Sequence, residues 1–200
     1  MTTARQTARI AALVAESVAV KQNYFATNAE AVARAASLIA ESFRNGGKLL
    51  LCGNGGSSCD AQHIAGEFVN RFLNPNRAAL PALALNTDGG VLTCIANDMG
   101  YEQIFARQVE AFGQAGDVLL AITTSGNSPN VIAAAETARA RGLKIVGLLG
   151  RDGGKIAPLC DVALIVPSPD TPRIQETHNL IGHILCELVE AELFDKRRNP

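Results

Sequence analysis

The hydrophobic pattern alternates between short apolar runs and longer segments in which apolar residues recur at helical spacing. Apolar runs bounded by glycine or polar turns are typical of buried strands. Five such runs cover residues 49–52, 81–85, 117–123, 143–149 and 161–166. Segments with apolar residues three or four positions apart predict helices. These segments cover residues 5–22, 28–43, 59–72, 91–96, 101–112, 132–141 and 173–194.

The order of these elements indicates the fold class. Strands alternate with helices from residue 49 onward, which predicts right-handed crossovers and an α/β fold with a doubly wound, five-stranded parallel sheet. Two helices precede the first strand. We therefore divide the chain into an N-terminal helical extension, residues 1–44, and one compact domain, residues 45–195. The extension packs either on its own sheet or on a neighbouring subunit, and the pattern leaves both open.

The composition narrows the class of protein. The chain has 200 residues, 48% of them hydrophobic and 18% charged, which fits one well-buried domain. The formal net charge is −1 and basic residues do not cluster, so we expect neither nucleic acid nor a membrane as a partner. No apolar run approaches the ~20 residues of a membrane span, and the first residues lack the apolar core of a signal peptide. Five scattered cysteines predict reduced thiols in a soluble cytoplasmic protein.

Residues 49–72, LLLCGNGGSSCDAQHIAGEFVNRF, predict a strand, a glycine turn and a helix. The glycines of the turn tolerate positive φ and leave backbone N–H groups uncovered. Ser57 and Ser58 are predicted to be the N-cap residues of the helix. The free N–H groups at the helix start, together with the helix dipole, predict an anion site at the end of the strand.

His63 and Glu67 lie four residues apart on this predicted helix and therefore project side by side, about one turn below the glycine turn. An imidazole and a carboxylate in this arrangement can bind a metal together or share a proton transfer. A solvated polar face is the simpler interpretation of such a pair in general. The neighbouring anion site favours a functional interpretation here.

A second loop, residues 123–130, reads TTSGNSPN and also lies between a predicted strand and a predicted helix. Ser128 and Pro129 are typical of an N-cap and a first helical position. The loop offers four hydroxyl groups and no lysine or arginine, which predicts a neutral phosphate-binding nest. A simple Ser/Thr-rich turn is the alternative. The absence of a Walker motif and of a complete dinucleotide fingerprint argues against ATP and NAD.

Four motifs in this order, CGNGGSSCDAQHIAGEF, ANDMGYE, TTSGNSPN and RIQETHNLIGHIL, resemble those of the sugar isomerase (SIS) family, and within it the phosphoheptose isomerases. The resemblance extends from the N-terminal helices to about Phe194. It implies a flavodoxin-like subunit in a homotetramer with active sites between chains. It also implies conversion of sedoheptulose 7-phosphate to D-glycero-D-manno-heptose 7-phosphate through an enediol, the first step of heptose biosynthesis for bacterial lipopolysaccharide and other cell-surface polysaccharides.

The resemblance also implies roles for individual residues. Glu67 corresponds to the general base and His183 to the general acid. The implied phosphate contacts are Ser57, Thr123, Thr124, Ser125 and Ser128, and the implied sugar contacts are Asn54, Gly55, Gly56, Asn97, Asp98 and Gln175. One Zn²⁺ ion per subunit is implied, with His63, Glu67, Gln175 and His183 as its ligands.

Helical geometry restricts this set of metal ligands. Gln175 and His183 are eight residues apart, so on one straight helix they are separated by ~12 Å along the axis and by roughly 80° in direction. We therefore expect Gln175 to lie at a frayed or capped helix start, or a second subunit to complete the site. His178 points ~140° away from His183 by the same geometry and is predicted to be a surface or interface residue.

Two other functions remain open. A non-catalytic SIS protein, such as the one that binds the replication initiator DnaA or a sugar-phosphate sensor, resembles the chain in its loops. The initiator-binding branch lacks the acid and the base, so the presence of Glu67 and His183 favours an enzyme. A phosphosugar isomerase acting on a pentose or hexose phosphate is the other alternative, because the motifs indicate the reaction type better than the sugar length.

Overall fold

The computed structural model describes residues 2–195, and at its centre is one sheet of five parallel strands. The strands are β1 (Leu49–Gly53), β2 (Ala82–Ala84), β3 (Val118–Thr123), β4 (Lys144–Gly150) and β5 (Val162–Val166). Their order is β2-β1-β3-β4-β5, with every neighbouring pair parallel. The predicted α/β class and the predicted strands are confirmed. This is the flavodoxin-like order, whose switch point lies between β1 and β3.

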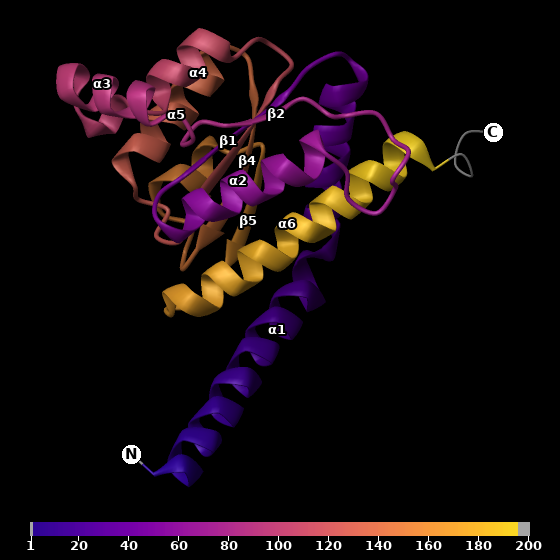
Figure 1. Ribbon diagram of the computed structural model, residues 1–200, viewed down its shortest axis with the longest axis vertical. Coiled ribbons are helices and arrows are strands. Elements are labelled where there is room, and N and C mark those ends of the chain that lie inside the picture. The colour runs from indigo at the N-terminus through magenta and orange to yellow at the C-terminus, as the bar shows by residue number, and fades with distance from the viewer. Residues whose placement is uncertain (1, 196–200) are drawn as a thin grey trace.

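Helices cover both faces of the sheet (Figure 1). One face carries α1 (Thr3–Arg44), α2 (Gly56–Val69) and α6 (Thr171–Phe194), and the other carries α3 (Gly89–Met99), α4 (Ala106–Phe112) and α5 (Pro129–Ala140). Each face has its own apolar cluster. Every residue of β1 and β3 is buried, and a fully buried aliphatic side chain stabilises the fold by about 1.5–3 kcal/mol. The two strands that carry the candidate loops are therefore rigidly held.

The N-terminal region forms one helix of 42 residues, and the prediction of two helices is wrong. The segment between the two predicted helices contains neither glycine nor proline to break the helix. Tyr24 in this segment is buried, and the Asn28 side chain donates to the Tyr24 carbonyl within the helix. Figure 1 shows α1 leaving the body of the molecule, with the N-terminus far from the sheet.

Other element boundaries also differ from the prediction: α3, for example, extends beyond the predicted 91–96 at both ends. The predicted helix 101–112 consists of a 3-10 turn, η1 (Tyr101–Gln103), followed by α4. A second 3-10 helix, η2 (Gly154–Leu159), follows β4, where only a turn was predicted; it contains Pro158, which disfavours a regular α-helix. Helix α2 begins and ends three residues earlier than predicted. Among the described residues, no helix is both long enough and apolar enough to span a membrane.

Candidate functional site

The first loop, after β1, turns through Gly55, which has a positive φ of 55° and is the N-cap residue of α2. Ser57 and Ser58 are therefore not the N-cap residues, contrary to the prediction. The helical turn is already closed upstream of them, because the Ser57 N–H donates to the Asn54 carbonyl and the Ser58 N–H to the Gly55 carbonyl, both at 3.0 Å. Ser57 is instead a buried residue in the first turn of α2.

A pair of amides joins this loop to the second one. Asn54 Nδ2 donates to Asn130 Oδ1 at 2.8 Å, and Asn130 Nδ2 donates back to Asn54 Oδ1 at 2.9 Å. The Tyr101 hydroxyl also donates to Asn54 Oδ1, at 3.2 Å. Asn130 and Tyr101 were not among the predicted site residues. The position of Asn130 in the second loop was the signal for it, whereas nothing in the sequence links Tyr101 to Asn54.

The second loop, after β3, gathers its hydroxyl groups. Thr123 Oγ1 lies 3.0 Å from Ser128 Oγ and 3.5 Å from Ser125 Oγ, and Ser125 Oγ accepts a bond from the Asn127 N–H. Ser128 is the N-cap residue of α5, as predicted, but its hydroxyl bonds Thr123 and not the helix. Thr124 lies in the same turn and is half-buried. The predicted hydroxyl-lined loop is therefore present at the carboxyl edge of the sheet.

The back of the second loop is closed by the loop that follows β4. Gly126 has a positive φ of 66°, and a Cβ atom there would overlap the backbone of Gly153 and Gly154. The Asn127 side chain accepts a bond from the Lys155 N–H across the same contact. The hydroxyl groups of the second loop are thus held by packing as well as by hydrogen bonds.

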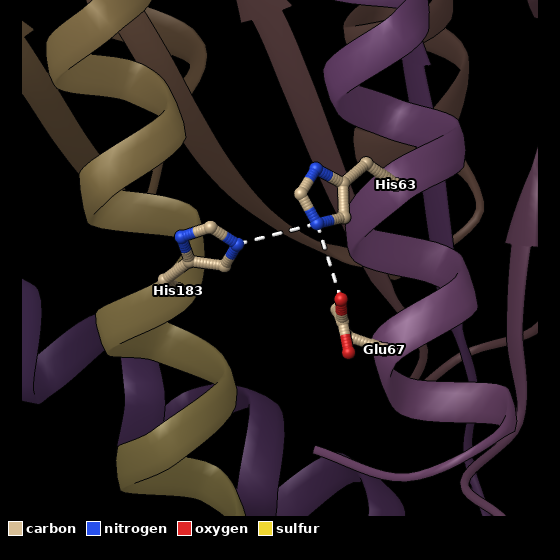
Figure 2. A group of neighbouring side chains, drawn as sticks. All are labelled: His63, Glu67 and His183. Carbon is tan, nitrogen blue, oxygen red and sulfur yellow. Dashed lines mark hydrogen bonds and ion pairs between the residues drawn. The ribbon is translucent and has the colours of Figure 1, made fainter.

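Two helices bring an imidazole pair and a carboxylate together (Figure 2). His63 and Glu67 come from α2 and His183 from α6; His63 Nε2 lies 3.1 Å from Glu67 Oε1 and 3.2 Å from His183 Nε2. The rings of His63 and His183 meet edge to face, with their centroids 4.9 Å apart. One ligand atom of each residue lies within 4.8 Å of the others. The predicted pairing of His63 with Glu67 is confirmed, and His183 joins it.

The donor set of this cluster fits a divalent metal ion. A neutral imidazole nitrogen carries either a proton or a lone pair. If His183 Nε2 is unprotonated, then it and Glu67 Oε1 are both acceptors, and they share a single proton on His63 Nε2. A cation satisfies all three acceptors at once. Two imidazole nitrogens bound tetrahedrally at ~2.0–2.1 Å lie about 3.4 Å apart, close to the 3.2 Å between His63 and His183.

The surroundings of the cluster are partly apolar. The Phe72 ring stacks on His183 with the centroids 5.7 Å apart and an interplanar angle of 19°. Asp60 lies one turn before His63 on α2 and receives a hydrogen bond from Asn179 of α6. Burial raises the pKa of the Asp60 carboxyl, although the bond from Asn179 and the charge of His63 act against the rise. Polar contacts therefore continue along the boundary between α2 and α6.

Gln175 lies in the regular part of α6, which runs without interruption from Thr171, so it is at neither a frayed nor a capped helix start. The other expectation, that a second subunit completes the site, stays a prediction. The Gln175 amide covers Gly56, where an added Cβ would overlap it. The helix rise from Gly56 to His63 is ~10 Å. Gln175 therefore lies beside the first loop, and its contacts with the sugar and with the metal both stay predictions.

Asn97 and Asp98 lie at the exposed end of α3. Asn97 Nδ2 donates to Asp98 Oδ1 at 2.7 Å, and the Cys94 thiol lies 3.7 Å from Asp98 Oδ2. These contacts are local to α3. The predicted contact of both residues with the sugar stays a prediction.

His178 is fully buried, which contradicts the expectation of a surface or interface residue. The side of α6 that carries His178 faces the sheet and not the solvent. His178 Nε2 lies 2.9 Å from the Leu149 carbonyl oxygen, so this nitrogen carries the proton. Burial lowers the pKa of His178 to about 4, and the bond to Leu149 opposes this only in part. Nδ1 has no hydrogen-bond partner among the described residues.

Comparison with known proteins places these features in a family. The family model for the SIS domain matches residues 13–150. The phosphoheptose isomerase of Thermodesulfovibrio yellowstonii is 55% identical over 180 residues, which is 90% of this chain and 89% of that protein.

Solved structures agree with this. The phosphoheptose isomerase of Neisseria gonorrhoeae superimposes with a TM-score of 0.88 at 46% identity, covering 93% of this chain and 99% of that one. The enzyme of the same name from Francisella tularensis gives a TM-score of 0.89 at 38% identity, covering 94% and 98% of the two chains. The chain belongs to the SIS domain family and, within it, to the phosphoheptose isomerases.

Proposed function

We propose that this protein is an aldose–ketose isomerase that converts sedoheptulose 7-phosphate to D-glycero-D-manno-heptose 7-phosphate, the first step of heptose biosynthesis for the bacterial cell surface. Its relatives at 55% identity bear the name of this activity. The observation that carries the proposal is that His63 and Glu67, on the helix that begins at the first loop, meet His183 of α6.

The two loops supply a site for the phosphate. The hydroxyl oxygens of Ser125 and Ser128 lie 3.5 Å and 3.0 Å from that of Thr123, and the amide pair joins their loop to the start of α2. Helix N-termini bind anions through free N–H groups and the helix dipole, so a phosphate needs no basic side chain here. We assign Ser57, Thr124, Gly55 and Gly56 to the same site, and the Gln175 amide of α6 lies against Gly56.

The sugar then extends along α2 toward the cluster. The rise from Ser57 to His63 is ~9 Å, comparable to the length of an extended heptose chain. Glu67 removes a proton from C1 of the ketose, and the electron pair forms the C1–C2 double bond of the enediol. His183 donates a proton to the O2 oxygen as the C2 carbonyl opens. Glu67 then returns its proton to C2 while His183 takes the O1 proton, which yields the aldose and restores both side chains.

We further propose one Zn²⁺ ion per subunit, held by His63, Glu67 and His183. Gln175 of the same chain lies against Gly56, ~10 Å along α2 from His63, so a Gln175 ligand would come from a second subunit. Two imidazole nitrogens and a carboxylate oxygen are the donors that zinc prefers. When bound, zinc polarises the carbonyl and stabilises negative charge on the enediolate oxygens. Because a carboxylate has two oxygens, ligation through one leaves the other able to accept the substrate proton.

The proposed assembly is a homotetramer in the cytoplasm, with residues 1–44 as the helical extension that packs on neighbouring subunits and residues 45–195 as the SIS domain. Ile10, Val14 and Val18 support this assignment. They recur every fourth residue on one face of α1 and are 61%, 58% and 46% exposed. Contacts between subunits at this face would cover them, and a second chain would also bring further side chains to the site.

The experiment is a direct assay of the reaction. The purified protein, supplied with Zn²⁺, is incubated with sedoheptulose 7-phosphate, and the anomeric proton signals are followed by NMR. Appearance of the aldoheptose signals is expected. Conversion of a pentose or hexose phosphate but not of the heptulose would assign a different sugar, and binding without conversion of any of them would contradict an enzyme.

A further inference from the structure

The end of α2 that carries Glu67 is held by a buried arginine. Arg77 Nη2 donates to the Glu67 carbonyl at 2.5 Å, and Nη1 donates to the carbonyls of Phe68 and Ala78, both at 2.9 Å. The last carbonyls of a helix lack partners within the helix, and a cation there also interacts favourably with the helix dipole. The backbone of the candidate base is therefore fixed by a side chain outside its own helix.

The same arginine is tied to α6. Arg77 Nε donates to Glu190 Oε2 at 2.6 Å, and the two side chains are 1% and 7% exposed. Glu190 lies seven residues after His183, so both project from the same face of α6 two turns apart. This buried ion pair therefore connects the backbone of Glu67 to the helix that carries His183.

Glu190 also anchors the segment that follows α2. Its carboxylate accepts the N–H groups of Phe72 at 3.2 Å, Leu73 at 2.9 Å and Asn74 at 2.6 Å. Burial alone would raise the pKa of Glu190, but the bonds from Arg77, Asn74 and Phe72 outweigh it, so the pKa is lowered and the carboxylate stays charged. Removal of one partner from such a network leaves a buried charge unpaired, which strongly disturbs the local structure.

Phe72 links this network to the chemistry. Its backbone N–H is bound by Glu190, and its ring stacks on His183. The Arg77–Glu190 pair thus acts on both proposed catalytic side chains: on Glu67 through the carbonyl that Arg77 binds, and on His183 through the ring that Glu190 helps to place. None of these three residues belongs to the cluster of Figure 2.

We propose that Arg77 and Glu190 are positioning residues of the isomerase, and that Phe72 transmits their effect to His183. The proposal rests on the proposed roles of Glu67 and His183. A displacement of about 1 Å at a reacting group can lower turnover by a factor of ~100. Loss of the pair is therefore expected to lower kcat while leaving the phosphate-binding loops, and with them KM, nearly unchanged.

The test compares Glu190 with Asp117, a second buried carboxylate that also accepts backbone N–H groups and pairs with a cation. Asp117 accepts the backbone N–H groups of Lys48 and Gln114 and the Lys48 ammonium, and is also buried. It lies just before β3, at the opposite edge of the sheet from the two loops. Asp117→Asn is therefore the control for Glu190→Gln, because both remove a buried charge but only one of them adjoins the proposed site.

Steady-state kinetics are measured with sedoheptulose 7-phosphate at a temperature at which circular dichroism shows every variant to be folded. Glu190→Gln and Arg77→Lys are expected to lower kcat by about 10- to 100-fold with KM changed less than about threefold, whereas Asp117→Asn keeps the wild-type kcat. Lysine cannot reproduce the several directed bonds of the guanidinium, so it does not restore the rate. Equal kcat losses at Glu190 and Asp117 would overturn the proposal.

Phe72→Leu keeps the test decisive if the ion-pair variants fail to fold. It removes the ring from His183 without touching Arg77 or Glu190, and a kcat loss of about tenfold is expected. Wild-type kcat in Phe72→Leu would overturn the role of Phe72 in transmission. Glu67→Gln, assayed in parallel, distinguishes failure of the proposed function from failure of this inference. An active Glu67→Gln variant refutes the proposed catalytic site. An inactive Glu67→Gln variant, together with fully active Arg77 and Phe72 variants, refutes only the positioning role.

Discussion

His63 and His183 come from different helices and approach each other through the same ring atom, Nε2, at 3.2 Å. The contact requires at least one of the two nitrogens to be unprotonated. Glu67 Oε1 lies 3.1 Å from the same His63 nitrogen, so three candidate ligand atoms surround one point. This relationship joins α2 to α6 and is the basis of the predictions on catalysis and metal binding below.

Replacement of Glu67 by Gln is expected to lower kcat by a factor of 100 to 10,000, the range that general bases supply. Substrate binding should persist, because the hydroxyl groups of the phosphate site are untouched. The measurements are kcat by the NMR assay and substrate affinity by calorimetry. Glu136→Gln, an exposed change on α5, is the control and should behave as wild type. Turnover within tenfold of wild type in Glu67→Gln would exclude it as the base.

Removal of metal is expected to lower the activity, and Zn²⁺ is expected to restore it. Calorimetric titration with Zn²⁺ should give one site per chain. His63→Ala and His183→Ala should weaken the affinity by at least the ~10–100-fold that even outer-shell changes cost. Cys94→Ser removes an exposed thiol outside the cluster and should keep the wild-type affinity. An enzyme that is fully active after chelation, with metal content confirmed as negligible, would contradict a role for zinc.

Thr123→Val tests the phosphate site with little change in volume. Thr123 is buried and bonds Ser128, so the change removes one hydroxyl from the second loop. Loss of one hydrogen bond to a charged group costs about 1.5–3 kcal/mol, or roughly a 10- to 100-fold rise in KM. Thr137→Val, whose hydroxyl bonds the Ala133 carbonyl within α5, is the matched control. An unchanged KM in Thr123→Val would place the phosphate elsewhere.

Because His178 is buried and its pKa is lowered, we expect the folded protein to lose stability in acid. Its pKa falls from 6.5 in the unfolded chain to about 4 in the fold, so the unfolded state takes up the proton first as the pH drops. The contribution to stability is intact above pH 6.5 and declines by up to about 3 kcal/mol as the pH falls to about 4. Urea unfolding at several pH values measures it. His178→Gln should flatten this part of the curve, whereas Glu136→Gln should not; identical curves for wild type and His178→Gln would refute the prediction.

The apolar face of α1 predicts a subunit contact. Val14→Glu should shift the sedimentation of the protein from a tetramer to smaller species, because an exposed apolar stripe would no longer be buried between chains. Glu16→Gln, an exposed change on the same helix, should leave the tetramer intact. A wild-type protein that sediments as an active monomer would contradict sites shared between subunits.

The strands and both loops were predictable because their signals are local. A buried run such as Leu49–Gly53 is continuous in the sequence, and the turn residues that follow it directly indicate what the loop can do. The pairing of His63 with Glu67 was predictable for the same reason, since four residues make one helical turn.

The remaining features depend on tertiary packing. The sequence around Tyr24 does not reveal that this side chain is buried and that α1 continues through it as one helix. Helical geometry gives the direction in which His178 projects from α6, but it does not reveal that the Leu149 carbonyl lies there. Arg77 and Glu190 are 113 residues apart and each resembles an ordinary surface residue in the sequence. Their pairing appears only when α2 and α6 are placed side by side.

The projecting start of α1 offers a way to observe subunit exchange in the proposed tetramer. Each of residues 3–12 is exposed in the single chain, and a helical end without tertiary support frays readily in water. Arg5 and Arg9 lie in this stretch and are cleavage points for trypsin. The rate at which trypsin releases the first peptide would then follow the fraction of chains that have left the assembly, and would fall as the protein is concentrated.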